Sequence, residues 1–137
     1  MISPKYININ RILGAMTFLI SFIVYFDTMA PSVSYWDCGE FIAVSYTLGV
    51  PHPPGSPLFL LLGRIASMLP ISEDIAFRVN LLSPLASAFS VLFLYFIIVQ
   101  LVNHWRGKIE TNTDALIAFG AGIVGLSLIH ISEPTRP

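Results

Sequence analysis

The chain has 137 residues, of which 55% are hydrophobic and 11% charged, with a net charge of −1 and a mean hydropathy of +0.76. Soluble globular domains carry about 25% charged residues, so this composition excludes a soluble domain and predicts an integral membrane protein. No basic cluster is present that would bind a nucleic acid. The single cysteine, Cys38, excludes an intrachain disulfide framework and a multi-cysteine zinc site.

The first predicted membrane span covers residues 12–30, whose single charge is Asp27 near the end. A helix of this length rises about 28 Å, close to the hydrocarbon core of about 30 Å. Lys5 and Arg11 precede the span, whereas no Lys or Arg occurs in residues 12–63. The positive-inside rule therefore predicts a cytoplasmic amino terminus and an outer side for the segment that follows. A cleaved signal peptide is the alternative, which we disfavour because a proline directly follows the only small-residue cleavage site.

Residues 31–57 are predicted to form the first outer loop. Within it, residues 36–48 place Phe41, Val44 and Leu48 at helical spacing, which predicts a short amphipathic helix lying on the membrane. Four prolines, at positions 51, 53, 54 and 57, then prevent a helix and favour an extended turn.

Three further apolar segments follow. Residues 58–70 are short for a span, residues 79–102 are a predicted span without a charge, and residues 115–125 begin another apolar segment. If 58–70 crosses the membrane, Arg106 and Lys108 lie outside, against the positive-inside rule. If 58–70 is re-entrant, both lie inside. The sequence leaves both topologies open.

The carboxy-terminal stretch LSLIHISEPTR, residues 126–136, resembles the in-frame translation of a transposase-based sequencing adaptor. A native polar tail is the alternative. We expect residues 126–137 to be foreign and the native gene to be interrupted near Gly125, so these residues are set aside. Residues 1–125 are then the amino-terminal part of a larger membrane domain.

Two carboxylates of the outer loop are candidate catalytic groups. Asp37 and Glu40 are three residues apart, so on a helix their Cβ atoms lie about 5–6 Å apart on one face. Repulsion near a low-dielectric boundary is expected to raise the pKa of one of them, which suits a general base or a metal ligand. The alternative is a capping box formed by Ser34 and Asp37 at a helix start.

Four other polar residues are candidate binding groups. His52 is held between prolines and presents a rigid imidazole, useful for a phosphate or a metal; an interfacial histidine in a stiff turn is the alternative. Arg64, Arg78 and Asn80 lie at or within membrane depth, where polar groups tend to face a cavity or a partner. A lipid phosphate is one partner for an arginine fork, and snorkelling to the interface is the alternative.

These motifs together resemble the GT-C superfamily of membrane glycosyltransferases. The stretch PSVSYWDCGEFIAVSYTLGVPHPPGSPLFLLLGR, residues 31–64, is similar to the amino terminus of a protein O-mannosyltransferase-like subgroup, long catalogued as a domain of unknown function, which carries D-[SC]-G-E-F followed by H-P-P-G. RVNLLS, residues 78–83, resembles its next segment. The similarity covers most of residues 12–102, and the paired motifs are more specific than either alone.

The resemblance implies an all-α integral membrane protein of GT-C type, with several spans, in the cell (inner) membrane. Similar enzymes transfer a sugar, here mannose or a similar hexose, from a polyprenyl-phosphate donor to a protein or glycan hydroxyl on the outer face, with inversion. By this resemblance Asp37 is the base, Glu40 orients the acceptor or assists Asp37, and His52 contacts the lipid phosphate or shapes the loop beneath it. No metal ligand is assigned, although a divalent metal is used by some members of the superfamily.

Similar proteins have many more spans, which supply most of the donor site, so the chain alone is expected to be inactive. Two other classes stay open from the residues themselves. If the chain is a fragment of a transporter, Arg64 and Arg78 are expected to matter more for its function than the acids of the outer loop. A non-catalytic membrane subunit predicts that neither group matters.

Overall fold

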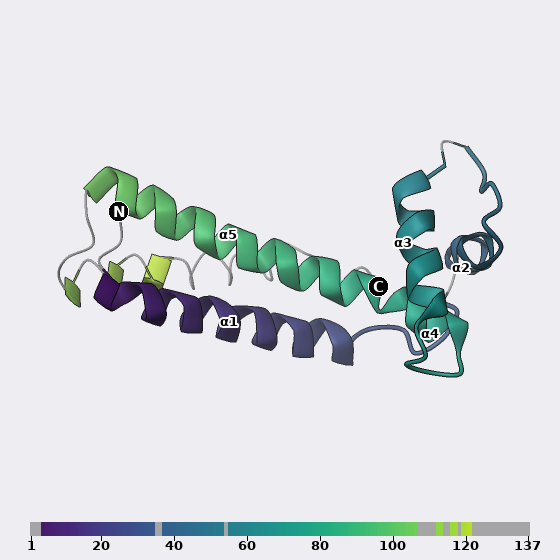
Figure 1. Cartoon of the computed structure of the whole chain (residues 1–137), viewed down its shortest axis with the longest axis horizontal. Helices are drawn as coiled ribbons and strands as arrows, with labels where there is room; N and C mark the ends of the chain where they lie inside the picture. Colours follow the sequence, from purple (N-terminus) through teal and green to yellow (C-terminus); the bar gives the residue numbers. More distant parts are fainter. Residues whose placement is uncertain are drawn as a thin grey trace, which may run out of the picture. The chain divides into compact units, whose positions relative to one another are not determined.

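The computed structural model describes residues 4–34, 37–53, 55–106, 112–113, 116–117 and 119–121. Within these ranges the chain is helical and contains no strand, which confirms the predicted all-α class (Figure 1). The helices are α1 (Pro4–Asp27), α2 (Cys38–Thr47), α3 (Pro57–Met68), α4 (Ile75–Asn80) and α5 (Leu82–Arg106). The chain divides into two compact units, one comprising Met1–Phe22 with Ser87–Pro137 and the other comprising Ile23–Ala86.

In the first unit, α1 packs against α5 through aromatic and aliphatic side chains. Tyr6 near the start of α1 is buried with Tyr95 and Val99 of α5. Further along α1 a Cβ on Gly14 would lie only 2.8 Å from the ring of Phe96, so the absence of a side chain at position 14 allows the close approach. The two helices therefore run antiparallel within this unit (Figure 1).

The outer surfaces of these two helices are apolar. Within the described residues, two helical stretches, Tyr6–Asp27 and Ile75–Trp105, are long and apolar enough to cross a membrane. Their large hydrophobic side chains remain exposed, which suits contact with acyl chains rather than water. The most exposed on α1 and α5 include Ile12, Met16, Leu19, Ile23, Phe93, Ile97 and Leu101.

The helices differ in extent from the predicted membrane spans, whose limits in the bilayer stay predictions. The helix that contains most of the predicted span 12–30 begins at Pro4 and ends at Asp27, because the polar residues before position 12 continue the helix. The predicted span 79–102 includes the end of α4, Leu81 and most of α5. The segment predicted for 115–125 is helical where it is described, at 116–117 and 119–121, and Phe119 is buried in the cluster with Tyr6.

The second unit is a cluster of α2, α3 and α4. Its core contains Ile42 of α2 with Ala76 and Val79 of α4. Helices α2 and α3 can approach closely because Gly63 has no side chain. A Cβ at this position would lie 2.5 Å from Oγ of Ser45. The segment predicted as a partial span, 58–70, is thus a helix whose small residues pack against neighbours. Its 12 residues rise about 18 Å, less than the hydrocarbon core of about 30 Å.

Candidate functional site

Asp37 lies at the amino-terminal end of α2. The helix begins at Cys38, so Asp37 is the N-cap residue, and its carbonyl accepts from the N–H of Phe41 at 3.0 Å. Its carboxylate makes no capping hydrogen bond. The alternative capping box was therefore wrong, because Ser34 lies outside the helix and Asp37 is not its third residue. The predicted helix 36–48 exists but begins two residues later, and position 36 lies outside the described residues.

The segment after α2 folds His52 back onto the helix. Leu48 ends α2 in a left-handed conformation with φ 55°. The N–H of Gly55 then donates to the carbonyl of His52 at 3.1 Å. Gly55 has φ 75°, a conformation that glycine adopts without the steric cost of a Cβ. The glycine of the His-Pro-Pro-Gly motif thus closes a turn whose first residue is the histidine.

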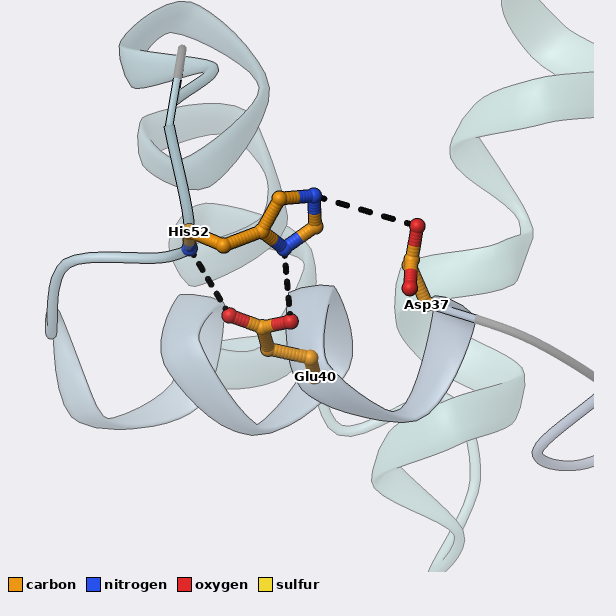
Figure 2. A group of neighbouring side chains, drawn as sticks. All are labelled: Asp37, Glu40 and His52. Atoms are coloured by element: carbon orange, nitrogen blue, oxygen red, sulfur yellow. Dashed lines mark hydrogen bonds and ion pairs between the residues drawn. The ribbon is translucent and has the colours of Figure 1, made fainter.

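His52 lies between the two carboxylates (Figure 2). Its backbone N–H donates to Oε1 of Glu40 at 2.9 Å, and its ring Nδ1 lies 2.8 Å from Oε2 of the same carboxylate. Its other ring nitrogen, Nε2, lies 3.8 Å from Oδ2 of Asp37. The structure therefore brings together three of the six predicted site residues, with His52 twelve positions after Glu40 in the sequence.

The cluster is open at the surface. The exposed fractions of the side chains are 53% for Asp37, 46% for His52 and 40% for Glu40. Phe41 supports the imidazole from α2, with the ring centroids 5.8 Å apart in an edge-on arrangement. A substrate can therefore reach both Asp37 and the edge of His52 that carries Nε2.

Pairing with His52 determines the electrostatics of the cluster. The hydrogen bond from the His52 side chain lowers the pKa of Glu40 from its ordinary range. The same bond raises the pKa of His52, followed by the charge of Glu40 and, as the smallest raising cause, the charge of Asp37. The sequence predicts that repulsion raises the pKa of one of the two carboxylates. For Glu40 this prediction is wrong, because the hydrogen bond from His52 favours the charged carboxylate.

An NMR titration of His52 is expected to show a pKa above its ordinary value of 6.5. Glu40→Gln is expected to return the pKa towards 6.5, and Asp37→Asn to lower it less. The pairing stabilises the loop most between the ordinary pKa values of 4.5 for Glu and 6.5 for His. It is lost as the pH rises through the raised pKa of His52 or falls through the lowered pKa of Glu40.

The NMR signal of the His52 imidazole is assigned from its absence in the His52→Gln variant. A His52 pKa that is the same in Glu40→Gln and in the unmodified chain would contradict the pairing.

The geometry leaves one edge of the imidazole available. A separation of 3.8 Å is longer than a hydrogen bond, so Nε2 can donate to a third group such as a phosphate oxygen. One ligand atom from each of the three side chains lies within 4.8 Å of the others, and two carboxylates with an imidazole can hold a divalent cation. Glu40 already uses both oxygens on His52, so a cation bound by all three would replace these bonds.

The other predicted binding residues bond within the chain. Arg64 donates to the carbonyl of Tyr46 and lies over its ring, with Cζ 5.5 Å from the centroid. Asn80 donates from Nδ2 to the carbonyls of Ala30 and Ser32 at 3.1 and 2.9 Å. None of these contacts joins either residue to the cluster at His52.

Arg78, in the last turn of α4, binds the end of α3 and the loop that precedes α4. Its guanidinium donates to the carbonyl of Ser67, to that of Leu69 at 3.2 Å and to that of Glu73 at 3.4 Å. These carbonyls belong to the last turn of α3 and the following loop, where no helical partner is present. The contacts give Arg78 a structural role in the second unit.

An open pocket of about 340 Å³ lies within the second unit. It is mostly apolar, and two of its aromatic residues, Phe41 and Phe59, contact edge to face with centroids 5.9 Å apart. The sequence places Phe41 on the apolar face of a helix but gives no sign of a pocket, because apolar residues stand out little in an apolar chain. The lining residues are Cys38, Phe41, Ile42, Ser56, Phe59, Val79, Asn80 and Ser83.

Comparison with known proteins places the cluster in a recognised sequence family. The family model described as protein O-mannosyl-transferase TMEM260 N-terminal domain matches residues 37–135. The range begins at Asp37 and includes the whole cluster. It also includes residues 126–135, whose adaptor origin stays a prediction and whose structure lies outside the described part.

Two curated relatives carry the same name. Protein O-mannosyl-transferase tmem260 of Dictyostelium discoideum is 38% identical over 98 residues, which cover 69% of this chain and 12% of the relative. Protein O-mannosyl-transferase TMEM260 of Mus musculus is 37% identical over 86 residues, which cover 63% of this chain and 12% of the relative. The chain thus matches about an eighth of their length. No solved structure matches it significantly. The predicted O-mannosyltransferase-like resemblance is confirmed, and the chain belongs to the family of the TMEM260 N-terminal domain.

Proposed function

We propose that the whole protein is a membrane O-mannosyltransferase in which this chain supplies the catalytic base. Its relatives are named protein O-mannosyl-transferases, which supports mannose as the sugar and a protein hydroxyl as the acceptor. The donor in this proposal is a polyprenyl-phosphate mannose, and transfer takes place on the outer face of the membrane.

The Asp37–His52–Glu40 cluster is the observation that carries the proposal. The Asp37 carboxylate is half exposed, is not used as a helix cap and lies beside a nitrogen that can donate. In the proposed step Asp37 takes the proton of the acceptor hydroxyl while the hydroxyl oxygen attacks the anomeric carbon. The bond from that carbon to the phosphate oxygen breaks, polyprenyl phosphate leaves, and the anomeric configuration inverts.

His52 and Glu40 have supporting roles in this step. The raised pKa of His52 favours the imidazolium, whose Nε2 can hydrogen-bond and neutralise the leaving phosphate. Glu40 uses both of its oxygens on His52, which supports a role in orienting the imidazole rather than the acceptor. Asn80, which lines the neighbouring pocket, remains a proposed donor contact. The backbone bonds of Arg64 and Arg78 favour positioning roles instead.

The test is transfer by the purified whole protein in lipid vesicles. Polyprenyl-phosphate mannose and a panel of acceptor domains rich in Ser and Thr are supplied, and mass spectrometry measures the addition of a hexose. An anomer-specific mannosidase then reports whether the configuration has inverted. Transfer from a nucleotide-linked mannose alone would overturn the proposed donor. No transfer from either donor to any acceptor, by protein that is correctly folded, would favour the transporter reading.

A further inference from the structure

Helix α3 has two faces of different character. Its small and medium residues, Leu60, Gly63, Ala66 and Ser67, are buried in the second unit. Its opposite face carries a continuous row of large apolar side chains at intervals of three or four residues, which we call the α3 stripe. Their exposed fractions range from 44% to 71%, and the residues are Leu58, Leu61, Leu62, Ile65 and Met68 of the helix with Leu69, the residue that follows its end.

The composition of the α3 stripe favours lipid as its partner. A contiguous exposed apolar row of this kind indicates contact with a partner or a membrane rather than with water. Packing between membrane helices favours small residues, which let the backbones approach. The stripe contains none, whereas Gly63, Ala66 and Ser67 all face inward. Large, branched aliphatic side chains are also what the spanning helices α1 and α5 expose.

The geometry of α3 is incompatible with a full crossing. Its rise of about 18 Å is little more than half of the hydrocarbon core. Pro57 begins the helix and Pro70 follows its end. Its one charged group, the guanidinium of Arg64, bonds to the carbonyl of Tyr46 at the end of α2. Tyrosine rings prefer the headgroup level, and this one is 48% exposed. The polar edge of α3 thus lies on the side of α2.

We infer that α3 lies within the outer leaflet with the α3 stripe against acyl chains, and that it does not cross the membrane. The second unit, which contains α2, α3 and α4, is then anchored to the bilayer by the α3 stripe. Of the described helices, only α1 and α5 then cross the membrane, so Arg106 lies on the side of the amino terminus. That side also holds Arg11, which satisfies the positive-inside rule. The inference does not depend on the proposed reaction.

Lipid contact is tested by quenching in phosphatidylcholine vesicles. An environment-sensitive fluorescent amino acid replaces Leu61 or Ile65, and lipids with a doxyl group at a shallow or a deep acyl position quench it. The matched control carries the fluorophore at Glu73, an exposed polar residue of the same unit. We expect several-fold stronger quenching at 61 and 65 than at 73, with the shallow quencher more effective at both stripe positions.

The same measurement in the whole protein separates lipid from other helices as the partner. Quenching in the 137-residue chain that disappears in the whole protein would mean that other helices cover the α3 stripe, and would overturn the inference. Depths that change steadily from a fluorophore at 58 to one at 69 would show a crossing helix, and would overturn it as well.

The side of residue 105 provides a second test. Trp105 is 85% exposed, so Trp105→Cys in a Cys38→Ser background gives one accessible thiol. A membrane-impermeant maleimide is expected to label this thiol from the side that also exposes an amino-terminal tag. Labelling from the opposite side would show that α3 crosses. Cys38 in the unsubstituted chain, which is exposed, is expected to be labelled from the side opposite to the tag.

Discussion

Asp37→Asn in the whole protein is expected to reduce the rate of mannosyl transfer by about 100-fold or more while leaving the fold intact. Asn has nearly the shape of Asp but cannot accept the proton of the acceptor hydroxyl. The carboxylate makes no capping hydrogen bond and lies 3.8 Å from Nε2 of His52, so the substitution removes no capping hydrogen bond from α2. The measurement is the rate of transfer from polyprenyl-phosphate mannose under single-turnover conditions, together with thermal stability in detergent.

Glu73→Gln is the matched control, because Glu73 is an exposed acid of the same unit whose side chain has no role in the proposed site. Its rate is expected to equal that of the unmodified protein. Unchanged turnover in Asp37→Asn would remove Asp37 from the mechanism.

Glu40→Gln separates the roles of the two acids. It is expected to reduce the rate less than Asp37→Asn, because Glu40 acts through the orientation and charge of His52. The loss is also expected to depend on pH, since His52 without Glu40 loses its proton at lower pH. A greater loss in Glu40→Gln than in Asp37→Asn would exchange the two assignments.

Arg78→Met is expected to destabilise the second unit by about 3 kcal/mol, the scale of losing hydrogen bonds from a charged donor to backbone carbonyls. The methionine preserves much of the apolar stem but cannot donate to the carbonyls of Ser67, Leu69 and Glu73. Arg78→Lys is expected to recover only part of the loss, because an ammonium lacks the planar fork.

Arg64→Met is the matched comparison and is expected to cost about 1 kcal/mol, since Arg64 makes one backbone hydrogen bond and one cation–π contact. Chemical denaturation in detergent, followed by circular dichroism, measures both variants. If Arg78→Met unfolds normally but binds the polyprenyl donor weakly, the predicted substrate-binding role is correct and the structural role is not.

Much of the helical architecture could be predicted from residue order. Apolar runs broken by proline or by charge determine where helices form, because helix formation and transfer into lipid depend mainly on local composition. The helix 58–70 and the two long apolar segments were identified in this way. The ends of the helices do not coincide with the ends of the predicted spans: α1 begins eight residues before the predicted span, because polar residues can continue a helix outside the hydrocarbon core.

The candidate site was predicted residue by residue, but not as an arrangement. Asp37, Glu40 and His52 stood out because charged groups and a histidine are rare in this chain and match the family motifs. Their pairing joins α2 to the turn that contains His52, and it depends on the left-handed conformations at Leu48 and Gly55. The sequence therefore indicated the residues, whereas the path of the intervening backbone decided that Glu40 binds His52.

By itself, the sequence determined the membrane class, the existence of the helices and the family, because composition, periodicity and motif spacing are properties of residue order. Only the tertiary structure decided which polar groups have intrachain partners. Arg78 and Asn80 looked alike as polar groups at membrane depth, yet each satisfies backbone carbonyls that are distant in sequence. Only packing also distinguished the two faces of α3, since Gly63 contacts Ser45 while the α3 stripe remains exposed. These outcomes depend on which elements meet in space, because a buried polar group must find a partner wherever the fold provides one.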